Sequence, residues 1–375
     1  MHTVAAEGVP ARVRSRRRSL DALRAFAIAA VVLIHAFQST YAEAGAAAAG
    51  SWPCALAVFV GRLGVPLFFF LSGTLLLGKR FETAGDVTAF YRRNLLPLLV
   101  TVEVWCVLYT LWLWACGQEP LDVGALVLKL LFLKDLPLTH WWYMPMILGI
   151  YLVVPFVSMV VRNMPFKAVL PVLALGCLSC VGIPLWDGLC ARLGLQGLEL
   201  AEGLQLDLSF YGGLYGIYLV LGYYLDRRGL LVRVSPRLLL IVLLVSAAVG
   251  VVQVYTRGDL WYNSLWVLIA ATCLFELVRH KDDPALVAPP EEPAGVGVPN
   301  PAQCCIAWVS KMSFGIYLCH MLFMPAMLTL TAAVSPVSLR SLACALALFA
   351  VALVFVFVSL VQPIPGLRRV LFDMR

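Results

Sequence analysis

The chain has 375 residues, of which 62% are hydrophobic and only 13% are charged, and its mean hydropathy is +0.89. Soluble domains carry about 25% charged residues, so this composition excludes a soluble protein and indicates an integral membrane protein. The net charge of +7 does not indicate a nucleic-acid partner, because the basic residues follow the pattern of a membrane topology signal.

Long apolar segments define the predicted architecture. About 20 predominantly apolar residues cross a bilayer as an α-helix, and the sequence repeats such segments along its length. We therefore predict an all-α fold, a polytopic bundle of about ten transmembrane helices. The predicted spans are residues 25–42, 54–77, 95–115, 142–161, 168–186, 208–225, 237–255, 260–278, 306–330 and 339–361.

The distribution of Lys and Arg predicts the orientation of these spans. Cytoplasmic loops of membrane proteins are enriched in basic residues. With ten spans and both termini in the cytoplasm, all but six of the 28 Lys and Arg residues lie on the inner side. The six on the outer side are Arg62, Lys129, Lys134, Arg192, Arg257 and Arg340. We therefore predict that both termini are cytoplasmic.

The first span holds the most informative residues. Arg24 and His35 are eleven residues apart, so in an α-helix they share one face and lie about 16 Å apart along the axis. Asp21 lies on the same stripe. Ionisable side chains inside a membrane are costly unless they face a partner or a hydrated cavity. The first span is therefore expected to carry chemistry or transport.

A cleavable signal peptide is the alternative interpretation of this segment. A basic run, a short apolar core and the small residues at 44–49 imitate one. Asp21, Arg24 and His35 suit the apolar core of a signal peptide poorly. Cleavage would also leave nine spans and place the new terminus outside, so we expect the segment to remain.

Small and basic residues mark the second and third spans. Pro66 is expected to distort the second helix, and Ser72 with Gly73 offers a small face for close helix contact. Arg92 and Arg93 open the third span at the inner interface. Topology, lipid headgroups or a polyanionic cofactor would each explain them, and composition alone favours topology.

Aromatic residues open the fourth span, in the segment HWWYMP at 140–145. An aromatic belt at the outer interface explains Trp141 and Trp142 without any function, and a platform for stacking sugars is the alternative. The outer segment 187–207 carries four acidic residues, which either form a solvated loop or bind a polar ligand.

The eleven cysteines fall mostly in or beside apolar spans. Cys177 and Cys180 form a CxxC, but the apolar segment around them holds no nearby His or acidic residue. Small packed thiols therefore explain this pair better than a metal or redox site. We expect no metal cofactor.

The late segment SFGIYLCH at 313–320 holds a second set of polar residues. Ser313, Tyr317 and His320 are spaced to share one helix face. His320 lies at a depth similar to that of His35, so the two imidazoles are expected to flank one cavity. A buried histidine in a soluble core is usually structural, but inside a membrane a functional role is favoured.

Five segments stand in a fixed order along the chain. They are LDALRAFAI (20–28) followed by His35, GVPLFFFLSG (64–73), YRRNLLP (91–97), WWYMP with YLVVP (141–155), and SFGIYLCH (313–320). Together they resemble the acyltransferase type 3 family of bacterial multi-pass membrane proteins, whose opening signature is Arg-x10-His. The resemblance covers most of the chain.

The resemblance implies transfer of an acyl group, commonly acetyl, from an acyl-CoA such as acetyl-CoA to a hydroxyl group. The implied acceptor is a cell-envelope glycan or lipid-linked saccharide, and the implied location is the bacterial inner membrane. Because no further domain follows, the chain is similar to the stand-alone subtype that includes the O-acetyltransferase of enterobacterial common antigen. Segments 187–207 and 279–304 match nothing in the family, so the acceptor stays open.

The resemblance also implies the catalytic residues, because the signature pair corresponds to Arg24 and His35. Imidazole has an ordinary pKa near 6.5, which suits a base that takes the proton of the acceptor hydroxyl. A covalent acyl-imidazole relay through His35 is the alternative. His320 is expected to assist in the acceptor half of the reaction.

A second group of residues is expected to bind the cofactor. Arg24, Arg92 and Arg93 are suited to the phosphates of coenzyme A. Ser72 and Tyr317 are expected to orient the imidazole or to donate hydrogen bonds to the developing oxyanion.

The expected organisation is a basic cytoplasmic segment (1–20), a transmembrane acyltransferase domain (21–365) and a cytoplasmic tail (366–375). The Pro-rich stretch 279–304 is expected to be a flexible cytoplasmic linker. The alternative function is a polysaccharide or lipid-linked glycan exporter without acyl transfer, because such proteins also carry many spans with scattered polar residues.

Overall fold

The computed structural model describes residues 17–45, 51–197, 213–258, 260–280, 300–361 and 371–372, which form helices and no strand. Eight helices in these ranges are long and apolar enough to cross a membrane. They cover Arg18–Ala44, Trp52–Leu76, Ala84–Ala115, Thr139–Asn163, Phe166–Leu193, Pro236–Arg257, Pro301–Leu322 and Val337–Leu360. The predicted all-α membrane fold is confirmed.

The other two predicted spans correspond to shorter helices. Helices α11 (Gly213–Arg227) and α13 (Leu265–Arg279) have 15 residues each, and α11 begins at the edge of a described range. The count of about ten spans and the cytoplasmic termini therefore stay predictions. Most of the predicted acidic loop and linker, residues 198–207 and 281–299, lies outside the described residues.

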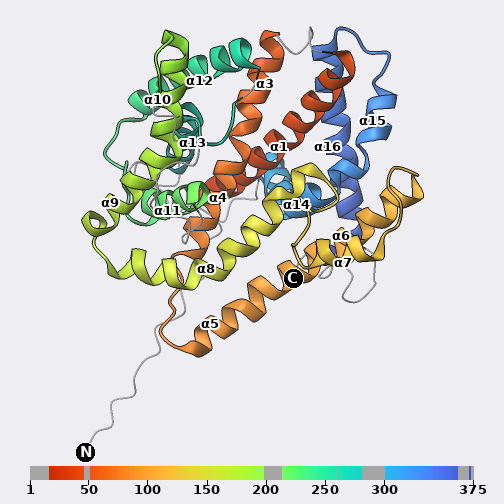
Figure 1. Cartoon of the computed structure of the whole chain (residues 1–375). Coiled ribbons are helices and arrows are strands. Elements are labelled where there is room, and N and C mark those ends of the chain that lie inside the picture. The colour runs from red at the N-terminus through yellow and green to blue at the C-terminus, as the bar shows by residue number, and fades with distance from the viewer. Residues whose placement is uncertain are drawn as a thin grey trace, which may run out of the picture.

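Helix α1 (Arg18–Ala44) runs through the middle of the bundle (Figure 1). It packs against α3 (Trp52–Arg62) and α4 (Gly64–Leu76) on one side and against α14 (Pro301–Cys319) and α16 (Val337–Val361) on the other. Neighbouring helices can therefore offer polar partners to the ionisable side chains of α1, as Ser310 of α14 does for Asp21.

The remaining helices complete the bundle around this centre. They are α5 (Ala84–Phe90), the π-helical turn η1 (Tyr91–Leu95), α6 (Leu96–Ala115), α7 (Val123–Leu130), the 3₁₀ turn η2 (Thr139–Trp142), α8 (Tyr143–Asn163), α9 (Phe166–Cys177), the π-helical turn η3 (Leu178–Gly182), α10 (Ile183–Leu193), α12 (Pro236–Arg257), the 3₁₀ turn η6 (His320–Leu322) and α15 (Met324–Leu330).

The second span is broken where proline chemistry requires it. A proline lacks an amide donor, and its ring clashes with the carbonyl group four residues earlier. For Pro66 that carbonyl belongs to Arg62, which is the last residue of α3, and α4 starts at Gly64. The predicted distortion of this helix is therefore confirmed.

Helices α4 and α11 approach each other through glycines. A Cβ atom added at Gly73 would lie 1.8 Å from the carbonyl oxygen of Leu219, and one added at Gly222 would lie 2.3 Å from that of Phe70. The Thr74 hydroxyl donates to the Gly222 carbonyl at 3.1 Å. Small residues let two membrane helices pack with their backbones in contact, so this pair of helices forms a close seam beside α1.

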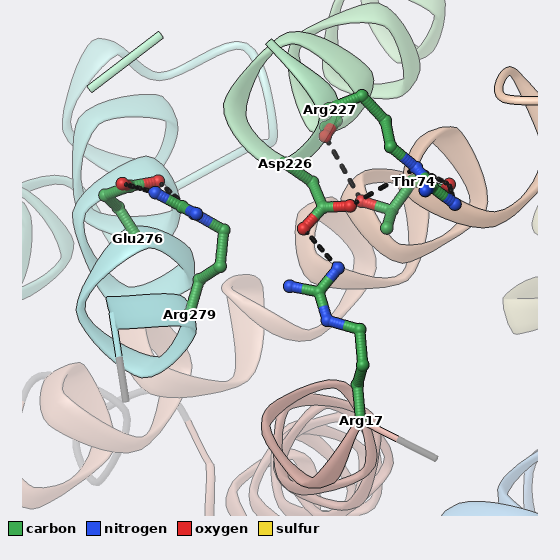
Figure 2. A network of polar contacts seen from close by, with 7 residues as sticks. Arg17, Thr74, Asp226, Arg227, Glu276 and Arg279 are labelled. Carbon is green, nitrogen blue, oxygen red and sulfur yellow. Dashed lines mark hydrogen bonds and ion pairs between the residues drawn. The ribbon is translucent and has the colours of Figure 1, made fainter. Parts of the chain in front are cut away.

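Helix α13 carries a carboxylate that is fully buried. Glu276 accepts hydrogen bonds from both Nε and Nη2 of Arg279, the first at 3.0 Å (Figure 2). Nδ1 of His280 lies 3.2 Å from Glu276 Oε1. Buried charges persist when they are paired and hydrogen-bonded. Arg279 lies on the same helix and His280 directly follows it, so the charge of Glu276 is compensated within this segment of the chain.

Candidate active site

A cavity of about 1180 Å³ lies between α1, α4, α8, α11 and α14. Most small-molecule pockets have about 300–1,000 Å³, so this cavity has room for a large ligand. The basic side chains that line it are Arg17, Arg24, Arg227 and Lys311. Asp21 is the one carboxylate among the lining residues that the structure describes, so the wall carries a net positive charge.

A buried carboxylate holds two of these cations in place (Figure 2). Asp226 Oδ1 lies 2.5 Å from Arg17 Nη1, and Oδ2 lies 3.5 Å from Arg227 Nε. The Asp226 side chain is 1% exposed, whereas those of Arg17 and Arg227 are 34% and 37% exposed. Arg227 also donates to the Thr74 carbonyl at 3.4 Å. Asp226 thus fixes two guanidinium groups at the cavity wall without facing the cavity itself.

Asp21 and Arg24 lie one turn apart on the cavity face of α1. The Ser310 hydroxyl of α14 donates to Asp21 Oδ1 at 2.7 Å, and both groups are buried. Arg24 is half-buried and lines the cavity. The shared stripe predicted for Asp21, Arg24 and His35 therefore runs from the cavity toward the centre of the bundle.

Three histidines from distant parts of the sequence meet beyond the end of this cavity. His35 lies on α1, His140 on η2 and His320 on η6. The ring centroid of His35 is 5.4 Å from that of His140 and 5.4 Å from that of His320, and the latter two are 5.1 Å apart. No group in the described ranges has the arrangement of a metal site, so we treat the cluster as three imidazoles.

The hydrogen bonds of His320 fix its tautomer. Its Nδ1 lies 2.8 Å from the Tyr317 carbonyl oxygen and 3.1 Å from that of Ile316. A carbonyl oxygen only accepts, so Nδ1 carries the proton and Nε2 of the neutral ring presents a lone pair. Nε2 is buried without a hydrogen-bond partner among the described residues. His320 is therefore poised to accept a proton.

Two tyrosines separate the cavity from the histidines. Tyr143 and Tyr317 line the cavity, and their ring centroids are 5.6 Å apart. The Tyr317 ring lies 5.7 Å from the His140 ring and 6.0 Å from the His320 ring. The Tyr317 hydroxyl donates to the His140 carbonyl at 2.7 Å. Tyr317 both lines the cavity and contacts two of the imidazoles, so a ligand against Tyr317 lies one side chain away from them.

The predicted site residues divide into two groups. Arg24, Ser72 and Tyr317 line the cavity, and His35 and His320 face each other beyond it. Tyr317 joins the two groups, because its ring lies 6.0 Å from that of His320.

The predicted phosphate ligands Arg92 and Arg93 lie elsewhere. Both are exposed on the π-helical turn η1 and are not among the residues that line this cavity. Their role in cofactor binding stays a prediction. The turn itself is informative, because π-helical insertions are frequent at functional sites.

Sequence reasoning missed three residues of this region. The aromatic-belt interpretation covers Trp141 and Trp142 and gives His140 no role, although an imidazole at the start of an apolar span is the same signal that identifies His35. Arg227 and Lys311 were interpreted as topology charges, and no local pattern separates a charge that orients a helix from one that lines a cavity.

A family model described as an acyltransferase domain matches residues 17–361. No curated protein and no solved structure matches the chain. The matched range includes the three histidines and the four basic residues of the cavity wall.

Proposed function

The chain belongs to the family of this acyltransferase domain, and from that membership we propose that it is a membrane O-acyltransferase. In this proposal it moves an acyl group, acetyl in the first instance, from acetyl-CoA or another acyl-CoA to a hydroxyl of a cell-envelope glycan or lipid-linked sugar. One observation carries the proposal: a cavity with a basic wall ends beside a cluster of three histidines. Within the family we propose the stand-alone subtype that includes the O-acetyltransferase of enterobacterial common antigen.

The charge of the cavity wall supports coenzyme A as the donor. Guanidinium and ammonium groups form short, charge-assisted hydrogen bonds with phosphate oxygens. In the proposal Arg24, Arg227 and Lys311 hold the phosphates of coenzyme A. The thin pantetheine arm then follows the cavity past Ser72 to Tyr317, which places the thioester beside the histidines.

The histidines support the chemistry of transfer. In the proposal His35 removes the proton of the acceptor hydroxyl while that oxygen attacks the thioester carbonyl carbon. A C–O bond forms, the C–S bond breaks, and the proton passes to the departing sulfur, so the products are an ester and free coenzyme A. The lone pair on His320 Nε2 offers a second site for that proton.

An aromatic cluster on another side of the histidines supports a sugar acceptor. The Trp142 ring lies 5.4 Å from the Tyr215 ring and 5.5 Å from the Tyr262 ring. The guanidinium carbon of Arg62 lies 4.5 Å from the centroid of the Trp261 ring and 5.2 Å from that of the Tyr262 ring. Flat aromatic faces suit the apolar faces of sugar rings, and this cluster lies apart from the donor cavity.

The proposal is tested with purified protein in lipid vesicles, supplied with radiolabelled acetyl-CoA and an envelope glycan fraction. Label in the glycan is expected for an acyltransferase. The exporter alternative predicts movement of the glycan with no label, and that outcome, repeated with other acyl-CoA donors, would remove the proposal.

Replacement of the central histidine gives the sharpest form of this test. We expect His35→Ala to abolish label transfer while the protein keeps its expression level and its thermal unfolding temperature in detergent. Gln38→Ala, an exposed change one turn along the same helix, is the matched control and is expected to transfer label normally. Acyl transfer by His35→Ala at the wild-type rate would contradict the assigned role.

A further inference from the structure

His140 is buried in a way that calls for a ligand. The residue is 5% exposed, and neither ring nitrogen has a hydrogen-bond partner among the described residues. Leaving a buried polar group unsatisfied costs about 1–3 kcal/mol, so native structures rarely keep such a group without a reason. The His140 ring packs against the rings of His35 and His320, so a ligand that reaches this cluster also reaches His140.

The surroundings hold His140 in one place. It belongs to the 3₁₀ turn that begins the fourth span, and its carbonyl oxygen accepts the Tyr317 hydroxyl at 2.7 Å. Its ring is packed among those of His35, His320 and Tyr317, with centroids 5.1–5.7 Å away. A donor that is fixed before the ligand arrives needs no reorganisation during a reaction, which is the condition for strong electrostatic stabilisation.

The three imidazoles differ in what they offer a ligand. His320 offers a lone pair, because its proton is held by backbone carbonyls. His140 has no such restraint, and an imidazole carries at least one N–H in either protonation state. One cluster thus combines a group that accepts a proton with a group that donates a hydrogen bond.

We propose that His140 is a further catalytic residue, whose ring N–H donates to the carbonyl oxygen of the acyl thioester. This inference rests on the proposed function and adds the binding site for the reacting carbonyl. When the acceptor oxygen attacks, the C=O electron pair moves onto this oxygen, and the N–H of His140 stabilises the negative charge. The pair returns as the C–S bond breaks, so His140 begins and ends the cycle with the same proton.

The test contrasts two replacements of His140. His140→Phe keeps a ring and removes the donor, whereas His140→Gln keeps an N–H donor and removes the ring. Loss of one oxyanion donor lowers kcat by about 10²–10³-fold, and we expect that loss for the Phe variant with its KM for acetyl-CoA changed less than about threefold. The Gln variant is expected to recover at least about tenfold of the lost rate.

A stability measurement separates a catalytic from a structural role. Replacing an unsatisfied buried polar side chain by an apolar one of similar shape is neutral or stabilising. We therefore expect the thermal unfolding temperature of His140→Phe to equal or exceed that of the wild type. Tyr224→Phe is the matched control, because its buried hydroxyl also lacks a partner among the described residues but lies outside the cavity and the cluster. It is expected to keep full activity.

A spectroscopic readout avoids dependence on the acceptor. With acetyl-CoA labelled with ¹³C at the carbonyl, the infrared carbonyl band of the bound thioester is expected at lower frequency in the wild type than in His140→Phe. Equal frequencies together with equal kcat values would overturn the role of His140 while leaving the acyltransferase proposal intact. A wild type that transfers no label from any acyl-CoA would reject both.

Discussion

At the scale of single residues, Arg24 combines a charge on a membrane helix with a position on a cavity wall. It is a charged group on the central helix, and it lines a cavity large enough to be hydrated. The carboxylate nearest to it in sequence, Asp21, already accepts the Ser310 hydroxyl at 2.7 Å. Arg24 therefore presents its charge to the cavity that we propose for the polyanionic donor.

Substitution of Arg24 is expected to weaken the binding of donors that carry the coenzyme A phosphates and to spare donors that lack them. For Arg24→Gln, loss of a charge-assisted contact worth about 1.5–3 kcal/mol should raise the KM for acetyl-CoA by about 10–100-fold. S-acetyl-pantetheine lacks the nucleotide, so its turnover should change little. Steady-state rates with the two donors check this, and an equal loss with both would show that Arg24 does not act on the phosphates.

The sequence alone predicts those site residues whose ionisable side chains would be energetically costly inside a membrane. Arg24 and His35 stand out because ionisable groups are expensive inside a membrane, and His320 was found by the same reasoning. Their meeting with His140 was not predictable, since periodicity along one helix says nothing about contacts between residues more than a hundred positions apart. Arg227 was missed for a related reason, because its role depends on Asp226 holding it at the cavity wall.

At the scale of helices, the seam between α4 and α11 determines where the cavity wall stands. Ser72 and Thr74 line the cavity from α4, and Arg227 lines it from the end of α11. Gly73 lies between the first two and contacts the α11 backbone. The position of the wall therefore depends on a residue without a side chain.

Adding one methyl group at this seam should separate the helices. We expect Gly73→Ala to lower the thermal unfolding temperature in detergent and to reduce donor binding, because its Cβ would overlap the Leu219 carbonyl. Gly149→Ala on α8 is the matched control, since nothing lies within 4 Å of the added atom. Unfolding curves of the two variants check this, and equal curves would show that the seam tolerates a larger spacing.

The sequence predicts the end of a helix where a single residue type, such as proline, determines it. Pro66 accounts for the break between α3 and α4. The predicted span 260–278 corresponds to α13, which has 15 residues, because apolar composition measures how well a segment tolerates lipid or protein and does not measure helix length. For the predicted span 208–225 the described residues begin only at Gly213. Arg92 and Arg93 lie on a π-helical turn. The spacing of apolar residues in the sequence does not predict such a turn.

At the scale of the whole molecule, the basic cavity residues gather at one end of the bundle. Arg17 and Arg24 belong to the start of α1, Arg227 ends α11, and Lys311 lies on α14. All four belong to segments that the distribution of Lys and Arg predicts to be cytoplasmic. The donor cavity is therefore expected to open toward the compartment that holds acyl-CoA.

Sidedness can be measured directly. Inside-out membrane vesicles are expected to transfer label from added acetyl-CoA, whereas sealed right-side-out vesicles are expected to do so only after permeabilisation, because coenzyme A esters do not cross a bilayer. Equal rates in both sealed preparations, with a leak marker retained, would contradict the predicted orientation.

The layer formed by Tyr143 and Tyr317 matters for the leakage of protons across the membrane. It stands between a cavity with a basic wall and a group of proton-binding rings, and those rings do not line the cavity. A continuous file of water through this point would discharge the proton gradient of an energised membrane. We therefore expect the two phenol rings to interrupt such a file of water when the cavity is empty.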